Sequence, residues 1–590
     1  GILLQVRHVR RCAMNHLPDG LCVADAKFLP IIAAYVNKLG IVETVDRMCP
    51  EAEECDVSPG RMMAAMILDT LTGRRPLYRL EATFENLDVE LLLGVPIRAE
   101  KLNDDAAGRA LDRIGRAGTG PIFSSIALTA ANLFNIDTSH VSHDTTSRIM
   151  YGHYDFYEDS KDEHPFEITY GFSKQKRPDL KQIVHSLLCV DHGIPIYMKT
   201  ESGNASDMKI SENILKWVVG SMRKFGERNM LYVGDSALVT EPNLKLMNDP
   251  KTGCRFVTRL PSRYTECKVA ISRAVDANEW EDEGSFSEEP ETPKRKHARY
   301  RVFETVVTLY GRLYRVIVVH SDAHDRRKTH GLERRIKDDE EKMTKILTAE
   351  QRIKYACRPD AEAALARLPE GPFHSLTGEI EEKAHYGRGR RKADGAGAPS
   401  RRTYHLKLRV TTKTDAVERA EKETGCFVLI TNVPKEGPDA MTAREVLAAY
   451  KDQHYIERNF GFLKDPVIVN SLFLKTPLRI EALGLVLVLS LLVWRLMERT
   501  MRASLKESGG TVRGWDKKQT TRPTSLMLTD VFMSVMVISS LGRRFLAKPL
   551  TSIQNAYLRI LKIPPRVFTD PDAGMESASN GNLPHHEDPG

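Results

Sequence analysis

The sequence lacks paired cysteines. Its nine cysteines are scattered, and no two of them stand in a Cys-x-x-Cys arrangement. Zinc knuckles use that spacing, and small secreted domains rely on dense cysteine frameworks. The pattern excludes both classes and favours a reducing compartment, so we expect a cytoplasmic protein.

Long apolar runs are also missing. The most apolar stretch, Ala482 to Trp494, has thirteen residues, and Arg495 and Glu498 follow at once. A membrane-spanning helix needs about 20 apolar residues. We therefore expect a buried helix here and no membrane association. The first residues, GILLQVRHVRRC, lack the uninterrupted apolar core of a signal peptide.

No strong excess of one charge is present. The net charge is +7, the pI is about 8.7, and both signs are mixed along the chain. This balance permits an acidic partner without requiring one. At 590 residues, with 41% hydrophobic and 28% charged residues, the chain is too long for one core and predicts about three or four domains.

Helical spacing of apolar residues dominates residues 20–135. Pro30 to Asp46 has this spacing, Ser58 before Pro59 predicts a capped helix, and Leu102 to Ile114 predicts another. A helix-turn-helix and a plain packed bundle are equally compatible with this pattern.

From Thr138 onwards the pattern predicts the order strand, strand, strand, helix, strand, helix, strand. The strands lie in HVSHDTTSRIMYG, QIVHSLLCVD, IPIYMKT, MLYVGDS and CRFVTRL, and the first helix covers about 206–225. Residues 263–425 predict a β-rich insertion, including a basic, glycine-rich loop with Arg388, Arg390, Arg391 and Lys392. That loop either grips phosphate or is simply solvated. GCFVLITN then predicts the last core strand, and a long helix is expected from Pro477 to Lys506.

The stretch YKDQHYIERNFGFLK predicts one helix opening at Thr442. Tyr450, Glu457 and Lys464 stand seven residues apart, which returns them nearly to the same side of a helix. Glu457 borders the apolar stripe of this helix. A solvated charged face is the simplest interpretation of such a glutamate.

Three acidic residues stand at suggestive places. Asp144 interrupts the first strand, Asp235 ends a buried strand, and Glu457 lies on the helix after the last strand. An aspartate at a strand end is usually a turn residue. Phosphodiester cleavage, however, uses divalent ions held by two or three carboxylates, because hard Mg²⁺ prefers oxygen ligands.

These features together resemble the DDE transposases, in particular a large insertion-sequence branch with the signature Tyr-x2-Arg-x3-Glu-x6-Lys. Tyr450, Glu457 and Lys464 match that signature, whereas Gln453 stands at its arginine. HDTTS, YGFSKQKRPDLKQIV, GIPIYMKTESGNASD, VGDSALVT, LGIVETVDRMCP and LNDDAAGRALDRI resemble the same branch. The resemblance runs over most of residues 30–540.

The resemblance implies an α/β fold with an RNase H-like catalytic core, interrupted by a β-rich insertion and preceded by an all-helical N-terminal domain. The expected parts are a helical domain that binds DNA ends (1–135), the first part of the core (136–262), the insertion with basic loops (263–425), the last core strand and catalytic helices (426–506), C-terminal helices (507–570) and a disordered tail (571–590).

The resemblance also implies that Asp144, Asp235 and Glu457 are the catalytic ligands of two Mg²⁺ ions, with Mn²⁺ as a possible substitute. Tyr450, Gln453 and Lys464 would contact DNA, the lysine as a point charge on a phosphate. In the basic hairpin, Lys174, Arg177 and Lys181 bind the DNA backbone or belong to a solvated loop. His143, beside Asp144, is expected to be a packing or hydrogen-bonding residue rather than a general base.

The expected activity is metal-dependent cleavage and strand transfer of an insertion-sequence element. The partners would be terminal inverted repeats, target DNA and a second copy of the chain in a synaptic homodimer, in the cytoplasm at the nucleoid. The alternatives are a non-catalytic DNA-binding descendant of a transposase and a stand-alone RNase H-like nuclease.

Overall fold

The structure is a computed structural model of the 590-residue chain. It describes residues 21–50, 55–73, 76–151, 154, 165–172, 177–221, 230–250, 254–287, 291, 296–386, 399–464, 474 and 476–573. Two compact units emerge: unit 1 contains residues 1–256 and 449–590, and unit 2 contains residues 257–448.

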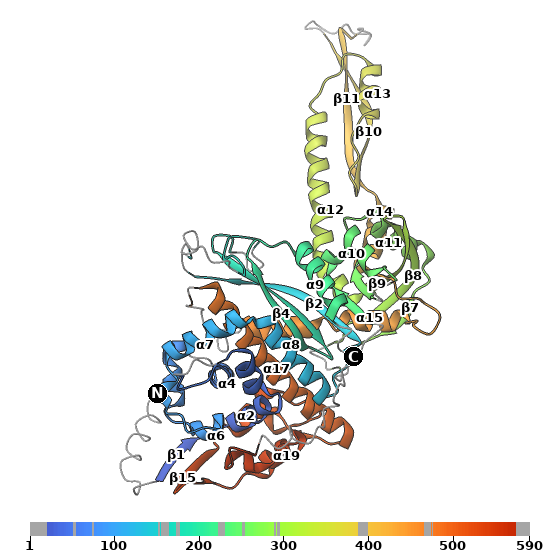
Figure 1. The fold of residues 1–590 in the computed structure, drawn as a ribbon. Helices are drawn as coiled ribbons and strands as arrows, with labels where there is room; N and C mark the ends of the chain where they lie inside the picture. The colour runs from blue at the N-terminus through green and yellow to red at the C-terminus, as the bar shows by residue number, and fades with distance from the viewer. Residues whose placement is uncertain are drawn as a thin grey trace, which may run out of the picture. The chain divides into compact units, whose positions relative to one another are not determined.

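Unit 1 contains the start of a large mixed sheet (Figure 1). Strands β2 (His140–Ile149), β3 (Gln182–Val190) and β4 (Ile194–Ser202) form an antiparallel meander, and β5 (Leu231–Gly234) lies parallel to β2. The strand order is β4-β3-β2-β5, followed by β6 (Arg255–Arg259). This mixed order is compatible with the expected RNase H-like core.

The N-terminal region is mostly helical, as predicted. Its helices are α2 (Leu29–Lys38), α3 (Ile41–Met48), α4 (Pro59–Leu71), α5 (Leu80–Phe84), α6 (Val89–Leu93), α7 (Asp104–Ala117) and α8 (Thr119–Leu133), so the stretch predicted from Pro30 to Asp46 is two helices. Ser58 caps α4 by accepting a hydrogen bond from Arg61 N, and Asn103 caps α7 by accepting one from Ala106 N. Both predicted caps are confirmed.

An all-helical N-terminal domain is not confirmed, because the described part begins with strand β1 (Leu21–Asp25). This strand pairs with β15 (Met536–Ser540), which pairs in turn with β16 (Arg543–Leu546). Figure 1 shows β1 and β15 side by side. The partner strand is over 500 residues away in sequence, so no local pattern could reveal the pairing.

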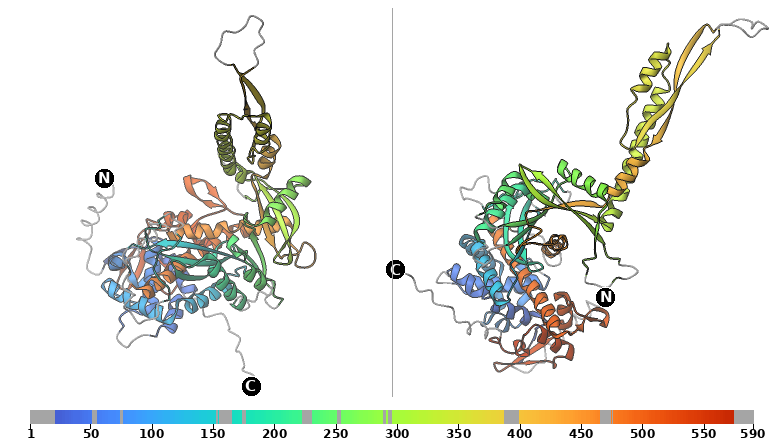
Figure 2. Two further views of the ribbon diagram at one scale, coloured as in Figure 1. Left: turned by 90° about the horizontal axis from the view of Figure 1, so that it is seen from above. Right: turned by 90° about the vertical axis from the view of Figure 1, so that its right-hand side faces the viewer.

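The predicted helix after Pro477 is α17 (Pro477–Ser508), and it is the centre of unit 1. It packs against α2, α4, α7 and α8, against β4, and against the C-terminal helices α18 (Ser525–Phe532) and α19 (Ser552–Ile560). Figure 2 shows the orange helix running among the blue N-terminal helices. Residues 482–493 are all buried, which confirms the predicted core helix.

By length and composition α17 is also the one helix in the described ranges that could cross a membrane. Its most apolar window has a mean hydropathy of 2.1, yet 83% of that window is buried inside the protein. A core helix of a globular domain has these properties.

The prediction of one continuous helix from Thr442 is wrong, because the helix is interrupted. The structure has two helices, α15 (Ala443–Lys451) and α16 (His454–Lys464), with Asp452 and Gln453 in a turn between them. No glycine or proline marks this break. Tertiary contacts accompany it: Asp452 lies 3.6 Å from His192 Nδ1 in the β3–β4 turn, and the ring of His192 meets Tyr455 edge-on.

Unit 2 is a smaller α/β unit. Its strand order is β6-β12-β9-β8-β7, and α11 (Thr265–Ala277) packs against β8, β9 and β12. The strands are β7 (Glu281–Gly284), β8 (Tyr300–Leu309), β9 (Arg312–Ser321) and β12 (Cys426–Thr431). Tyr310 and Gly311, both with positive φ, form the two-residue loop between β8 and β9.

An arm extends from the sheet of unit 2. It consists of α12 (Asp322–Glu350), α13 (Arg358–Ala366), and the antiparallel pair β10 (His374–His385) and β11 (Arg401–Thr412), followed by α14 (Thr414–Glu423). The chain enters and leaves the arm between paired strands: His320 faces Cys426, and Ser321 N donates to Gly425 O.

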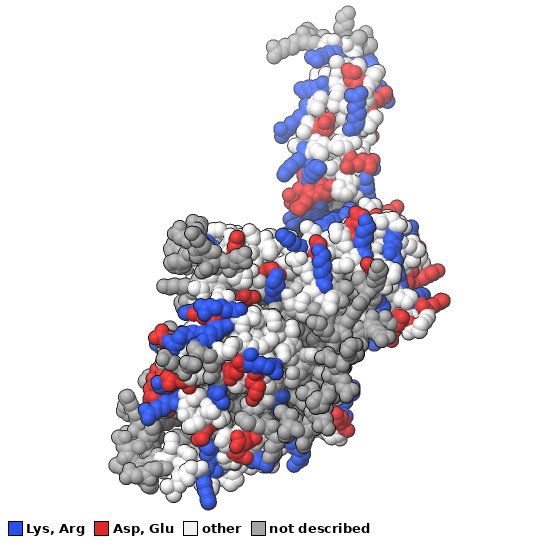
Figure 3. Space-filling view, in the orientation of Figure 1, with Lys and Arg blue, Asp and Glu red and all other residues white. Residues whose placement is uncertain are grey.

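The expected β-rich insertion is therefore only partly what the structure has. The 29-residue α12 was not predicted, because its sequence is mostly charged. Leu332, Asp339 and Met343 form its buried side, and α12 packs against β10 and β11 (Figure 1). Figure 3 shows Lys and Arg side chains interspersed with Asp and Glu along the arm. Arg388, Arg390, Arg391 and Lys392 lie outside the described residues.

One buried polar cluster joins α12 to the base of β10. The Asp339 carboxylate accepts hydrogen bonds from Phe373 N, His374 N and His374 Nδ1 at 2.9–3.1 Å. Burial alone would raise the pKa of Asp339, but these hydrogen bonds hold the pKa below its usual value. A carboxyl with a depressed pKa stabilises the fold above its unfolded pKa of about 4 and loses this effect as the pH falls.

We predict that Asp339→Asn weakens the arm by about 1–3 kcal/mol, because one charged acceptor of three hydrogen bonds is lost. Hydrogen exchange of the β10 amides measures this local stability. In the wild type, protection should fall as the pH drops below about 4, whereas the variant should show less of this dependence. Glu379→Gln, at an exposed position of β10, is the matched control. Equal protection in both variants would contradict the role of Asp339.

Candidate functional site

Two of the predicted carboxylates stand at matching places on neighbouring strands. Ser142 of β2 pairs with Val233 of β5 in parallel register. Asp144 and Asp235 each lie two residues further along, so both side chains point to the face that carries Ser142 and Val233. Because neighbouring strands are about 4.8 Å apart, the two aspartates are adjacent at the carboxyl end of β5.

Local hydrogen bonds orient both carboxylates. Asp144 Oδ1 accepts a hydrogen bond from Thr145 N at 2.7 Å. Asp235 Oδ1 accepts one from Ala237 N at 3.0 Å and caps the short 3₁₀ helix Ser236–Leu238. Both aspartates are half-buried, so each keeps some access to solvent.

Helix α16 covers the same face of the sheet. Cys189 of β3 lies opposite Ser142 and therefore shares its face. Asn459 Nδ2 of α16 donates to Cys189 Sγ at 3.2 Å and to Gly193 O at 2.8 Å. Gly193 has a φ of +102°, and an added Cβ would come within 3.1 Å of Tyr455 Cβ. Glycine at this turn thus permits both the backbone conformation and the close approach of α16.

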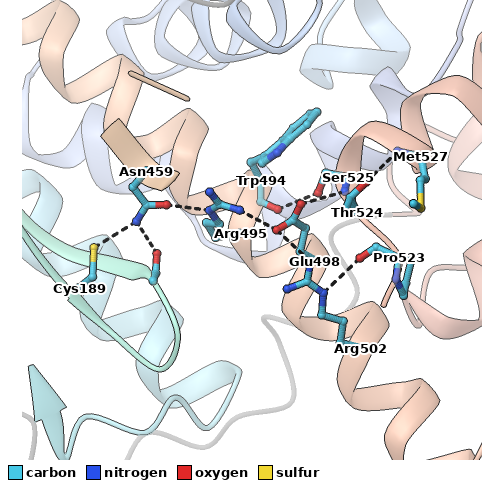
Figure 4. A network of polar contacts seen from close by, with 11 residues as sticks. Cys189, Asn459, Trp494, Arg495, Glu498, Arg502, Pro523, Thr524, Ser525 and Met527 are labelled. Carbon is cyan, nitrogen blue, oxygen red and sulfur yellow. Dashed lines mark hydrogen bonds and ion pairs between the residues drawn. The ribbon is translucent and has the colours of Figure 1, made fainter. Parts of the chain in front are cut away.

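A buried polar network holds Asn459 itself (Figure 4). Arg495 Nε of α17 donates to Asn459 Oδ1 at 2.7 Å, and Arg495 Nη1 donates to Glu498 at 2.7 Å. Glu498 also accepts from Ser525 N of α18 and lies 3.6 Å from Arg502. The network therefore connects β3, α16, α17 and α18.

Glu457 lies on α16 two residues before Asn459, and its side chain is exposed. In the described parts of the chain, no three His, Cys, Asp or Glu side chains come close enough together to hold a metal ion. Asp144 and Asp235 fit one hydrated Mg²⁺, which proteins bind through one or two carboxylates. The structure does not assemble Glu457 with them.

Burial keeps two titratable groups near the aspartates in one state. Burial lowers the pKa of His185 to about 3, with Arg148 and Lys464 adding to the effect, so this imidazole is neutral at neutral pH. Burial raises the pKa of the Cys189 thiol to about 12. Neither group can exchange a proton near pH 7, so the aspartate face itself has no general base from these residues.

The charge of Lys464, which contributes to the lowered pKa of His185, also relates α16 to strands β2 and β3. His185 faces Thr146 in the β2–β3 pairing, two residues beyond the level of Asp144. Asn459 places α16 at the level of Ser142, and the positive charge of Lys464, the last residue of the helix, acts on His185. Asp144 stands between the levels of Ser142 and Thr146 on β2.

The remaining predicted DNA contacts are more dispersed. Tyr450 lies one residue before the end of α15 and Gln453 lies in the following turn, both half-buried, so neither shares a helix with Glu457. Arg177 forms a two-pronged exposed ion pair with Asp179 at 2.6–2.8 Å, and Lys181 is half-buried just before β3. Lys174 lies outside the described residues. His143 is buried and hydrogen-bonds Ser186 Oγ at 2.9 Å, as expected of a packing residue.

The sequence pattern did not single out Asn459, Arg495 or Glu498. A lone asparagine on a helix carries no spacing signal. Arg495 and Glu498, three residues apart just after a long apolar run, mark the end of that run and by themselves predict no site. Charges placed directly after a buried stretch of the same helix are the signal that could have indicated a buried ion pair.

Comparison with known proteins leaves the family of the chain open. The profile of a domain of unknown function, DUF4277, matches residues 22–128, a minority of the chain. No curated protein sequence matches the chain. The chain is similar to the piggyBac transposase in a cryo-EM structure of its synaptic complex with hairpin DNA. The identity is 8%, 95% of this chain and 87% of that chain are covered, and the TM-score is 0.36. A likeness at this level carries no argument about fold or function.

Proposed function

We propose that this chain is a DNA transposase of the DDE type that cleaves the ends of an insertion-sequence element and joins them to target DNA. The observation that supports the proposal most is the matched register of Asp144 and Asp235 on the parallel strands β2 and β5. The Tyr450, Glu457 and Lys464 pattern adds to it through family resemblance.

In the proposed reaction, water attacks a phosphodiester, the bond from phosphorus to the 3′-oxygen breaks, and the 3′-oxygen leaves with a proton. The freed 3′-hydroxyl then attacks a phosphodiester of the target strand and loses its proton as its oxygen bonds to phosphorus. The bond from that phosphorus to the target strand's own 3′-oxygen breaks, and this oxygen leaves with a proton. Asp144 and Asp235 would hold Mg²⁺, or Mn²⁺ in its place, and Glu457 would join them as the third ligand of a two-ion site when DNA is bound. The bound ions would supply charge stabilisation at the phosphate.

The other residues would position the DNA. Lys464 would place its charge near a backbone phosphate, and Tyr450 and Gln453 would contact the strand from the α15–α16 turn. Glutamine brings no charge, so its contact with phosphate would be weaker than that of the arginine in related sequences. Lys181 and Arg177, with Lys174, would contact the backbone further along.

The proposal also includes a homodimer that holds two element ends, terminal inverted repeats as the specific DNA, and action at the nucleoid in the cytoplasm. A stand-alone nuclease would cleave without joining strands, and a non-catalytic descendant would bind DNA without cleaving it. Incubating the full chain with a plasmid that carries its own gene and flanking DNA, with Mg²⁺, distinguishes these outcomes. Joined strands support the transposase.

We predict that Asp144→Asn, Asp235→Asn and Glu457→Gln each reduce Mg²⁺-dependent cleavage on the order of 100-fold or more, while DNA binding stays close to that of the wild type. Each change removes a charge without changing the side-chain volume. Asp530→Asn, at an exposed position of α18, is the control. Cleavage at the wild-type rate by any one of the three variants would remove that residue from the site.

We also predict that Asn459→Leu lowers cleavage more than DNA binding. The substitution leaves Gly193 O and the Arg495 guanidinium without their buried partner, at about 1–3 kcal/mol for each group. Hydrogen exchange of the α16 amides, measured where the protein remains folded, should show lost protection. Arg458→Gln, on the exposed side of the same helix, should change neither quantity. Unchanged protection in Asn459→Leu would mean that the network does not position α16.

A further inference from the structure

Three aromatic side chains are exposed where β2 ends and β3 begins. The exposed fractions are 60% for Tyr151, 56% for Tyr170 and 88% for Phe172, and we call these residues the aromatic surface. Single exposed apolar residues are common, but a group of large exposed rings marks a place of interaction.

The backbone beneath Tyr170 and Phe172 is firmly held. Thr169 and Gln182 exchange two backbone hydrogen bonds, at 2.9 and 3.3 Å. The buried Gln182 side chain donates from Nε2 to Gly203 O at 2.8 Å and to Phe172 O at 3.2 Å. The two rings are therefore presented by an anchored segment, which lowers the entropy cost of binding.

Close packing of Gly171 explains why the rings face outward. A Cβ at this position would overlap Gly203 O, so Gly171 lies directly against that backbone. In an extended segment, successive side chains point to opposite sides. Tyr170 and Phe172, the two neighbours of Gly171, carry the exposed rings on either side of this close contact.

Two basic residues lie in sequence beside the aromatic surface: Lys181, just before β3, and Arg177, which is paired with Asp179. Met150 N, next to Tyr151 in the sequence, donates to Lys181 O at 2.9 Å. Thr169, next to Tyr170, is hydrogen-bonded to Gln182, the residue after Lys181. Tyr151 also lies within electrostatic reach of Arg177. Rings that alternate with cations are the arrangement that proteins use for single-stranded nucleic acid.

The aromatic surface is in line with the aspartate pair. Ile149, the last residue of β2, is five steps along the strand from Asp144, about 17 Å at 3.3 Å per residue. Arg148 of the same strand lies between them, and its charge and that of Lys464 of α16 both act on His185. A strand whose phosphate reaches Asp144 and Asp235 would meet these cations next and the aromatic surface after them.

We propose that the aromatic surface stacks unpaired bases of the DNA strand that passes over Asp144 and Asp235. This inference rests on the proposed function and extends it to the form of DNA that the site prefers. Rings supply stacking that tolerates any base sequence, and the cations between them accompany the backbone.

Fluorescence anisotropy at one salt concentration tests the proposal. The probes are a labelled single-stranded oligonucleotide, the same sequence as a full duplex, and a duplex with six unpaired bases. Phe172→Ala and Tyr170→Ala should each weaken binding of the two probes with unpaired bases by about tenfold, and of the full duplex by less than twofold. Phe172→Trp should restore binding. Phe545→Ala, an exposed phenylalanine of β16, is the control.

The outcomes separate this proposal from the proposed function. Equal affinity of the wild type for single strands and duplex, or equal effects of Phe172→Ala and Phe545→Ala, would overturn it. A change of oligomeric state in Phe172→Ala, seen by light scattering without a change in DNA affinity, would also overturn it and assign the surface to a second copy of the chain. Ring-dependent binding without any cleavage would support the aromatic surface while refuting the transposase.

Discussion

The candidate site depends on one buried side chain. Asn459 is fully buried and satisfies Cys189, Gly193 and Arg495 at once. An asparagine amide has both donors and an acceptor, so it can serve a strand on one side and an arginine on the other. Inside a protein such bonds are strong when complete and costly when broken. The position of α16 over the aspartate face therefore tolerates little change at this residue.

The network around Asn459 is connected, through α17, to helices from both ends of the chain. Arg495 and Glu498 belong to α17, whose apolar residues are covered by the N-terminal helices and by α18 and α19. Burial of about 0.8 kcal/mol per methylene makes such a helix a main source of stability. The segments around the aspartate face are thus packed against residues more than 300 positions away in the sequence.

Much of the fold follows from local patterns, because alternation and capping act within a few residues. The strands of the meander, the caps Ser58 and Asn103, and the buried run of α17 were all predicted. The break after Lys451 is accompanied by contacts with His192, a residue of another turn, and β1 pairs with the distant β15. The sequence could place Asp144 and Asp235 on strands, but only the pairing of β2 with β5 makes them neighbours. Asn459 carries no pattern at all.

The arm of unit 2 starts and ends at neighbouring, hydrogen-bonded residues, Ser321 and Gly425. In topological terms the whole arm is the loop of a β-hairpin formed by β9 and β12. The entropy cost of closing a loop grows only slowly with its length. Segments inserted or removed at such a junction leave the register of the flanking strands unchanged. A change in the length of the arm is therefore compatible with an unchanged sheet and an unchanged aspartate pair.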